Sequence, residues 1–369
     1  MDKPTRVLQV VAKMNRAGTE TMLMNYYRHV DRKKVQFDFA VCTEEKCDYE
    51  EEILSMGGHI YRYPRYKGWN HFQYVAWWKR FFLRHPEYHI VHGHIGSTAA
   101  IYLKIAKQFK CFTIAHSHGT KEPLSLRSLM YQIYSYPTRF IADQFFGCSM
   151  QALEDRYGKK VAHGSKAKVL NNAIDSGLYA YNKKKRDNIR TELRIADNTF
   201  VIGTIGRLSP PKNPFMVVNI LAELKKRNLD FKFLWVGVGE MKRDIEKAII
   251  QKNLTSNVVM LGLRDDIPCI LQAFDVFILP SVWEGLGIVA IEAQAAGLPT
   301  LCSDQVPIEA KVTNLCEFIS LSSISLWADS IIMCLSKMRL NTTDLIKNNG
   351  YDIYDNAVWL QDFYNGAIE

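Results

Sequence analysis

The 369-residue sequence lacks several features that assign a chain to a class at once. Its eight cysteines form no Cys-x-x-Cys pair, so neither a zinc ribbon nor a disulfide framework is indicated. The glycine triplet of dinucleotide-binding proteins is missing, which argues against a dehydrogenase. Charged residues interrupt the N-terminal stretch and no long apolar run follows, so we expect neither a signal peptide nor a transmembrane helix.

The pattern that is present alternates short apolar strands with helical stretches. Strand candidates in the first half are 7–11, 37–41, 59–61, 90–91, 112–115, 145–146 and 169–170, and those in the second half are 200–203, 231–236, 258–261, 276–279 and 300–302. Such alternation predicts parallel sheets with right-handed crossovers. We therefore predict an α/β protein with two Rossmann-like, doubly wound parallel-sheet domains that face each other across a cleft.

The domain boundaries follow from a change in composition. The segment from Asp175 to Asn198 contains the run Lys183 to Arg186 and few large apolar residues, which indicates a linker together with a solvated helix. We predict a first domain at 1–175, a linker at 176–198, a second domain at 199–345, and a C-terminal helical segment at 346–369 that returns to the first domain.

Charge is distributed unevenly along the chain. Residues 1–180 hold 26 Lys and Arg against 16 Asp and Glu, a net charge of +10, whereas residues 181–369 hold 21 against 22, a net charge of −1. A basic half suggests an anionic partner such as a membrane surface, a phosphorylated lipid or nucleic acid, unless it serves solubility alone. Because no helix-turn-helix or finger spacing is present, we expect no nucleic-acid partner.

Loops after the strands carry groups that suit a phosphate-containing ligand, and in such sheets ligands bind at the carboxyl ends of the strands. Gly18 leads into a helix whose first N–H groups could face an anion, although one glycine is a weak signal. Arg207 and Lys212 flank a proline-rich loop after the strand at 200–203. Two fixed cations at a strand end suit a diphosphate.

The loop after the strand at 276–279 combines small residues with two carboxylates. Gly285 and Gly287, on either side of Leu286, let backbone amides approach a phosphate. Glu284 and Glu292 can accept hydrogen bonds from sugar and ribose hydroxyls. The two glutamates at this spacing, together with Arg207 and Lys212 upstream, form a combination that chance rarely produces and that indicates a ligand site.

Two His-x-His pairs also follow predicted strands, His92 with His94 and His116 with His118. Four imidazoles at one sheet edge could form a metal site for hydrolysis. That alternative needs a carboxylate ligand and leaves the two glutamates unexplained, so we predict no metal site.

These motifs resemble the family 4 retaining glycosyltransferases of the GT-B fold, most closely the branch for bacterial capsular and exopolysaccharide biosynthesis. The resemblance covers nearly the whole chain. It rests on Gly18-Thr19-Glu20, Val91 to His94, Ala115 to Gly119, Asn171 to Asp175, Gly206-Arg207 with Lys212-Asn213, Gly237 to Glu240, and Glu284 through Glu292.

The resemblance implies a hexosyltransferase that moves a hexose or N-acetylhexosamine from a nucleotide-diphosphate sugar, with UDP as the expected nucleotide. The acceptor would be a hydroxyl of a growing, lipid-linked surface polysaccharide. The first domain would bind the acceptor and the second the nucleotide sugar.

The resemblance also implies roles for single residues. Arg207 and Lys212 would neutralise the donor diphosphate, helped by amides of Gly285 to Gly287. Glu284 would touch the transferred sugar, Glu292 the ribose, and the loop at Arg264 would lie beside the base. One of His116 and His118 would face the donor sugar, and His118 is favoured because Gly119 follows it.

Two departures from the family pattern stand out. Ala17-Gly18 replaces a common glycine pair, and Gln305 to Ala310 replaces a glycine-rich segment that helps to select the hexose, which leaves the sugar open. No Asp-x-Asp occurs, so the metal-bridging motif of the other large glycosyltransferase fold is missing. We therefore expect metal-independent transfer without a cofactor, in which protein cations stabilise the leaving diphosphate.

A stretch from Tyr61 to Arg84 holds three tryptophans, four tyrosines, three phenylalanines and six Lys or Arg. Aromatic rings favour the headgroup boundary of a membrane, and basic side chains favour anionic lipid. We therefore predict a cytoplasmic protein whose first domain docks on the inner face of the cell membrane. The competing interpretation is a sheet-packing helix whose core stripe includes Tyr74, Trp78 and Phe82.

Other function classes remain open from the sequence. A nucleotide-sugar epimerase could use the same two-domain scaffold, and a non-enzymatic binding protein could share the ligand site. An epimerised free sugar nucleotide, formed without acceptor, would favour the epimerase.

Overall fold

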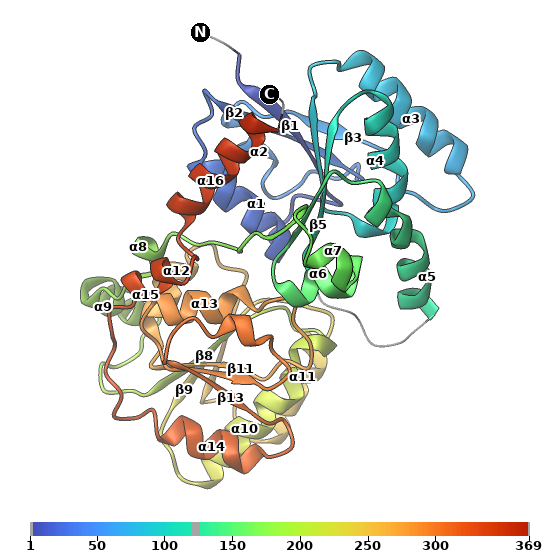
Figure 1. Cartoon of the computed structure of the whole chain (residues 1–369). Coiled ribbons are helices and arrows are strands. Elements are labelled where there is room, and N and C mark those ends of the chain that lie inside the picture. The colour runs from blue at the N-terminus through green and yellow to red at the C-terminus, as the bar shows by residue number, and fades with distance from the viewer. Residues whose placement is uncertain (1–2, 120–125, 368–369) are drawn as a thin grey trace. The chain divides into compact units, whose positions relative to one another are not determined.

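The computed structural model describes residues 3–119 and 126–367 (Figure 1). The chain forms two compact units, unit 1 with Met1–Ile174 and Asp352–Glu369, and unit 2 with Asp175–Tyr351. Each unit contains one all-parallel sheet with helices, so the predicted fold of two doubly wound α/β domains is confirmed.

Unit 1 contains a seven-stranded sheet in the order β3-β2-β1-β4-β5-β6-β7. Its strands are β1 (Thr5–Val10), β2 (Val35–Val41), β3 (Ile60–Arg62), β4 (Ile90–Gly93), β5 (Phe112–Ser117), β6 (Gln144–Gly147) and β7 (Ala167–Val169). Every residue of β2 is buried, which suits a strand covered on both faces. In the register of β1 and β4, Gln9 lies opposite His92.

Helices cover both faces of this sheet. They are α1 (Gly18–His29), α2 (Glu50–Ser55), α3 (His71–Arg84), η1 (Gly96–Thr98), α4 (Ala99–Gln108), α5 (Leu126–Ser135), η2 (Tyr136–Phe140), α6 (Met150–Tyr157), α7 (Lys159–Ala162) and α16 (Ile353–Gly366). One core cluster joins the sheet to α1, α2 and α16, and the other joins it to α3, α4 and α6.

The last helix, α16, completes unit 1. Its side chains of Ile353, Ala357, Leu360 and Tyr364 are buried in the cluster that contains α1. The chain returns beside the point where it left, because Ile353 donates its backbone N–H to the carbonyl of Ile174 at 3.0 Å. Unit 1 is therefore built from two segments of the sequence.

Unit 2 contains a six-stranded sheet in the order β10-β9-β8-β11-β12-β13. Its strands are β8 (Val201–Ile205), β9 (Lys232–Val236), β10 (Val258–Gly262), β11 (Val276–Leu279), β12 (Thr300–Ser303) and β13 (Cys316–Ile319). Its helices are α8 (Ser176–Tyr179), α9 (Lys183–Glu192), η3 (Pro210–Lys212), α10 (Pro214–Lys226), α11 (Lys242–Gln251), α12 (Ile267–Ala273), α13 (Ile288–Ala295), η4 (Ile308–Ala310), α14 (Ile324–Ile332) and α15 (Thr343–Asn348).

The segment at 176–198 contains the expected helix, α9, together with α8, but it belongs to unit 2 and is not a separate linker. Arg190 is 1% exposed and donates to the Asp275 carboxylate at 2.7 Å, and Arg186 donates to the other oxygen at 2.5 Å. These buried ion pairs fasten α9 to the start of β11, whereas its polar composition had indicated a solvated segment.

Among residues 3–119 and 126–367, none of the helices has the length and apolar character that crossing a membrane requires.

Candidate active site

Three loops interlock at the carboxyl ends of β8, β9 and β11 in unit 2. A Cβ on Gly237 would lie 2.1 Å from the carbonyl oxygen of Gly206, and one on Gly239 would lie 2.2 Å from that of Leu208. Val282 donates its backbone N–H to the carbonyl of Pro211 at 2.8 Å. Only glycine permits such close backbone approach, so the glycines fix the loops that carry the predicted cations.

Lys212 and Glu284, predicted from different loops, form an ion pair. The distance from Lys212 Nζ to Glu284 Oε1 is 2.5 Å, and the hydroxyl of Ser281 donates to the same oxygen at 2.7 Å. The Glu284 side chain is 8% exposed and that of Lys212 is 28% exposed. The structure therefore brings one predicted diphosphate ligand beside the predicted sugar ligand.

The turn from Glu284 into α13 has the conformation that its glycines require. Gly287 caps the N-terminus of α13 in the left-handed region at φ 82°, and no side chain caps the first turn. Leu286 is buried and anchors the turn. The N-terminal N–H groups of this helix are available for hydrogen bonds to an anion, as predicted for the segment Gly285 to Gly287.

Glu292 lies on α13, one and a half turns further along, and is buried. The hydroxyl of Tyr179, from α8, donates to Glu292 Oε1 at 2.9 Å. Burial raises the pKa of Glu292 to about 7, and the hydrogen bond from Tyr179 opposes part of that rise. The carboxyl group is thus poised to change its charge near neutral pH.

The other two predicted cations of unit 2 are held differently. Arg207 is 71% exposed and pairs with Glu240, with 3.1 Å between Nε and Oε2. Arg264 pairs with Asp266 at 2.7 Å and with Glu192 at 2.9 Å, and these hydrogen bonds raise its pKa. Arg207 is therefore free to swing on its long side chain, whereas Arg264 is fixed between two carboxylates.

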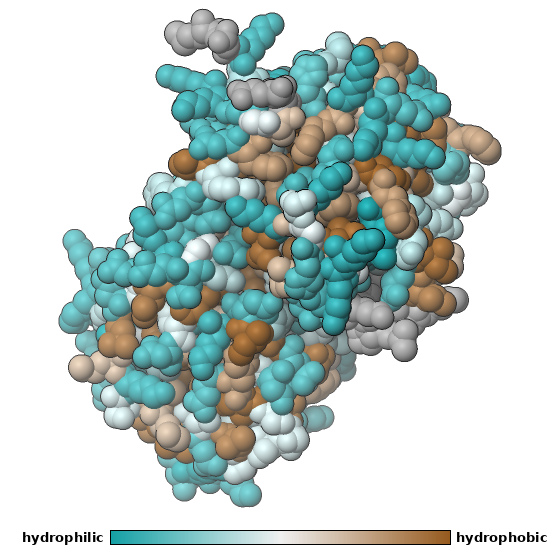
Figure 2. Space-filling model, in the orientation of Figure 1, coloured by the Kyte–Doolittle hydropathy of each residue, from teal (hydrophilic) through white to brown (hydrophobic). Residues whose placement is uncertain are grey.

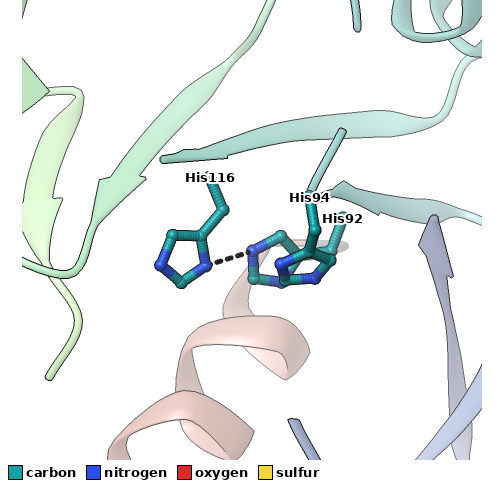
Figure 3. A group of neighbouring side chains, drawn as sticks. All are labelled: His92, His94 and His116. Carbon is teal, nitrogen blue, oxygen red and sulfur yellow. Dashed lines mark hydrogen bonds between the residues drawn. The ribbon is translucent and has the colours of Figure 1, made fainter. Parts of the chain in front are cut away.

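In unit 1 the two histidine pairs form one cluster at the ends of β4 and β5, where His92 and His116 are buried and His94 and His118 are half-buried. Figure 3 shows three of the four, His92, His94 and His116. His92 Nε2 lies 3.2 Å from His116 Nδ1, and His94 Nδ1 lies 2.7 Å from His118 Nε2. The rings of His116 and His118 stack with centroids 4.0 Å apart. All four predicted imidazoles are therefore brought together.

Burial lowers the pKa of all four histidines, to about 3 for His118, so the cluster is neutral near pH 7. The ligand nitrogens of His92, His94 and His116 lie within 4.8 Å of one another. No carboxylate joins this group among the described residues. Hydrogen bonds between ring nitrogens already use the lone pairs that a metal would need.

Gly18 is the first residue of α1, and Ala17 before it provides no side-chain cap. A Cβ at Gly18 would meet nothing within 4 Å, so no packing constraint explains glycine there. Both facts agree with a helix N-terminus open to a ligand.

Comparison with known proteins identifies the chain. The model of the family described as "Glycosyl transferases group 1" matches residues 185–331. The putative glycosyltransferase EpsF of Bacillus subtilis is 33% identical over 379 residues, which cover 99% of this chain and 97% of EpsF. The chain belongs to the group 1 glycosyltransferases. The family predicted from the sequence is thereby confirmed.

A second relative of this glycosyltransferase is the UDP-Gal:alpha-D-GlcNAc-diphosphoundecaprenol alpha-1,3-galactosyltransferase of Escherichia coli, 29% identical over 303 residues, or 76% of each chain. The fold is also that of HepE from Anabaena, solved with UDP and glucose, with a TM-score of 0.78 at 17% identity over 98% of this chain and 100% of HepE. The lipopolysaccharide glycosyltransferase WaaG gives a TM-score of 0.76 at 16% identity over 98% of this chain and 100% of WaaG.

Some contacts of the predicted site residues in each unit were not found from the sequence. Tyr179 lies in the segment interpreted as a linker, and Gln9 and Tyr364 lie 355 positions apart yet touch each other and the histidines. Tyr364 reaches β1 only because α16 returns to unit 1, and no local sequence pattern predicts that contact. A glutamine inside an otherwise apolar strand was the one available signal for Gln9.

Proposed function

We propose that this glycosyltransferase is a retaining, metal-independent enzyme that transfers a hexose or N-acetylhexosamine from a UDP-sugar to a hydroxyl of a growing, lipid-linked surface polysaccharide. The observation that supports it best is the arrangement at the carboxyl edge of the unit 2 sheet. Lys212 contacts Glu284 there, and Glu284 begins the turn that leads through the N-terminus of α13 to Glu292.

The chemistry that this edge supports is stabilisation of a leaving diphosphate. Lys212, Arg207 and the N–H groups at the start of α13 supply positive charge where the glycosidic bond breaks, and each donor of this kind is worth about 3–4 kcal/mol. Glu284 would then release Lys212 to the diphosphate and accept a hydrogen bond from the sugar. An oxocarbenium-like sugar is attacked from the face that the diphosphate leaves, and a donor phosphate oxygen takes the acceptor proton.

The relatives support the nucleotide and the acceptor class. HepE binds UDP and glucose, and the E. coli relative uses UDP-galactose and a sugar linked to diphosphoundecaprenol. We infer the same class of donor and a lipid-linked acceptor for this chain. The departure at Gln305 to Ala310 leaves the choice of hexose to experiment.

A lipid-linked acceptor requires the enzyme to reach a membrane surface, and we place that contact in unit 1. Trp69, Phe72 and Leu83 are 77%, 85% and 69% exposed in or beside α3. A groove of about 470 Å³ beside the second half of α3 is lined by three arginines, Arg62, Arg80 and Arg84, together with aromatic residues. Exposed aromatic rings beside cations suit an anionic lipid surface, at about 1 kcal/mol for each cation.

The part of the predicted docking stretch that faces the core is larger than expected. Tyr63, which does not belong to the core stripe of Tyr74, Trp78 and Phe82, is buried and donates its hydroxyl to the carbonyl of Val11 at 3.1 Å. Unit 1 also exposes apolar side chains on α5 and η2, namely Leu129, Ile133, Tyr136 and Phe140. Figure 2 shows apolar side chains among hydrophilic ones on unit 1. Under this proposal the enzyme works at the cytoplasmic face of the membrane.

The test of the function is a donor screen with the full chain. Purified protein is incubated with UDP-sugars and a lipid-linked acceptor, and NMR of the product reads the anomeric configuration. We expect one UDP-hexose or UDP-N-acetylhexosamine to be used with retention, at a rate unchanged by EDTA. An inverted product contradicts the retaining mechanism, and a requirement for Mn²⁺ or Mg²⁺ contradicts metal independence.

A further inference from the structure

The two ends of the Gln9 side-chain amide, its oxygen and its nitrogen, both make hydrogen bonds that lead to the histidine cluster of unit 1. Its amide oxygen Oε1 lies 2.8 Å from His94 Nε2, and its amide nitrogen Nε2 donates to the Tyr364 hydroxyl at 3.3 Å. Gln9 and Tyr364 are fully buried. An amide oxygen only accepts and an amide nitrogen only donates, so each end forces one direction on the hydrogen bonds that follow.

The first chain runs from the amide oxygen to His118. Because Oε1 of Gln9 accepts, His94 must carry its proton on Nε2, and its neutral ring then leaves Nδ1 as an acceptor. His118 therefore donates from Nε2 to His94 Nδ1 across 2.7 Å. The remaining nitrogen of His118, Nδ1, is a bare acceptor, and it is buried without a partner among the described residues.

The second chain runs from the amide nitrogen to His116. The Tyr364 oxygen accepts from Gln9, so its own proton goes to His92 Nδ1, 2.6 Å away. His92 then carries its proton on Nε2 and donates to His116 Nδ1 at 3.2 Å. His116 is left with a proton on Nε2, and that N–H is also buried without a partner in the part of the chain that the structure describes.

We propose that Gln9 is a positioning residue that sets the tautomers of all four histidines, so that His116 Nε2–H and His118 Nδ1 form a matched donor and acceptor for a hydroxyl group. A hydroxyl both accepts and donates, and the two rings stack with centroids 4.0 Å apart. The identification of that hydroxyl as one on a sugar substrate rests on the proposed function. The tautomers themselves do not.

The orientation of one amide controls the whole cluster. If the Gln9 amide were reversed, every hydrogen bond in both chains would reverse, and all four rings would carry the proton on Nδ1. With the amide as observed, all four carry it on Nε2. The two states are opposite at every ring, so one spectrum distinguishes them.

The experiment is long-range ¹H–¹⁵N NMR of the full chain labelled at histidine, at pH 7.5 and without substrate. We expect His92, His94, His116 and His118 to show a protonated Nε2 and a bare Nδ1. A proton on Nδ1 of any of these rings would overturn the proposal. This spectrum needs only the wild-type protein, so it tests the predicted tautomers even if the variants fold poorly.

Gln9→Glu tests control by the amide. A carboxylate takes the Tyr364 proton, so Tyr364 must accept from His92, and His92 and His116 move their protons to Nδ1 while His94 keeps its Nε2–H. The matched control is Gln36→Glu, because Gln36 is buried and donates to the Tyr27 hydroxyl at 2.5 Å in the same unit. That variant should leave all four tautomers unchanged, and an unchanged His116 in Gln9→Glu would refute the control by Gln9.

Turnover then tests the hydroxyl. With His116 converted to an acceptor, the bound hydroxyl loses its donor, and we expect Gln9→Glu to lower turnover at least fivefold relative to Gln36→Glu. Switched tautomers with equal turnover in the two variants would refute the hydroxyl assignment. A lack of turnover in the wild type would instead count against the proposed function and leave the NMR result standing.

Discussion

At the scale of single residues, the ion pair of Lys212 and Glu284 carries the most direct prediction. Under the proposed function Glu284→Gln and Lys212→Met would each remove a contact to the reacting donor, so each should lower turnover tenfold or more while the fold survives. Initial rates and circular dichroism check both points. The control is Lys242→Met, because Lys242 is 51% exposed and lies on α11 of the same unit. Wild-type rates in both site variants would contradict the assignment.

Glu292 makes a prediction about stability. Its pKa is about 7 in the folded protein against an ordinary value of 4.5, so the folded state holds the proton more tightly than the unfolded state. Its favourable contribution is complete below pH 4.5 and is lost as the pH rises through 7. Replacing it by glutamine should therefore stabilise the protein relative to wild type by about 3 kcal/mol more at pH 8 than at pH 4.5.

Urea unfolding of Glu292→Gln and wild type at several pH values measures this difference. The same variant should bind UDP more weakly, because it loses a carboxylate acceptor for the ribose. A stability difference that does not vary with pH would show that Glu292 titrates normally. Tighter UDP binding by the variant would contradict the ribose role.

The residues themselves show where sequence reasoning stops. The placement of Lys212, Glu284 and Glu292 at one edge of the unit 2 sheet could be predicted, because each lies just after a strand or in the helix that follows. Tyr179 and Gln9 could not, because each acts through a partner more than 80 residues away. The contact between Glu284 and Lys212 is likewise a product of loop packing, since each was predicted to meet a different part of the donor.

At the scale of loops and strands, the glycines of the unit 2 edge are the sensitive points. Gly239→Ala would place a Cβ 2.2 Å from the carbonyl oxygen of Leu208, so the loop at Arg207 to Lys212 must shift. We expect a loss of about 1–3 kcal/mol of stability together with weaker UDP binding. The control is Gly366→Ala in α16, where a Cβ meets nothing within 4 Å. Calorimetry should find the control equal to wild type or slightly more stable.

Most strands were predictable because they are continuous apolar runs bounded by turns. β13 was missed, since its sequence Cys-Glu-Phe-Ile has an exposed glutamate and only four residues. Its place is set by the ladder with β12, which pairs Thr300 with Cys316. The burial of the segment at 176–198 could not be predicted from its polar composition. Two of the arginines that make it polar, Arg186 and Arg190, are the side chains that anchor it to Asp275.

At the scale of the whole molecule, the four neutral histidines predict how the chain responds to acid. Their pKa values lie below the ordinary 6.5, so the unfolded state binds more protons as the pH falls below 6.5. Each histidine then lowers the free energy of unfolding by about 1.4 kcal/mol per pH unit. Glu20 and Glu292, each with a pKa raised by burial to about 7, bind their protons more tightly in the folded state and together oppose two of the four.

Urea unfolding of the full chain between pH 7.5 and pH 5 measures this slope. His92→Gln should reduce it by the contribution of one histidine, and His89→Gln, at an exposed position of the same unit, is the matched substitution for comparison. Equal slopes in wild type and His92→Gln would show that His92 does not resist protonation.

Membrane docking is also a property of the assembled surface. We expect the chain to sediment with vesicles that contain anionic lipid, and the bound fraction to fall as salt rises. Replacing Trp69 and Phe72 by serine should release it, and Phe215→Ser in unit 2, 44% exposed, serves as the control. Equal and negligible binding to neutral and anionic vesicles would remove the membrane from the proposed function.

The return of the chain to unit 1 has a consequence for synthesis on the ribosome. Unit 2 is complete once Tyr351 has emerged, but unit 1 still lacks α16, which supplies Ile353, Ala357, Leu360 and Tyr364 to its core. We therefore expect unit 2 to complete its fold before unit 1, although N-terminal domains usually fold first during translation. Until α16 emerges, the nascent chain would display the apolar face of unit 1 that α16 covers, and at this stage a chaperone would have most to protect.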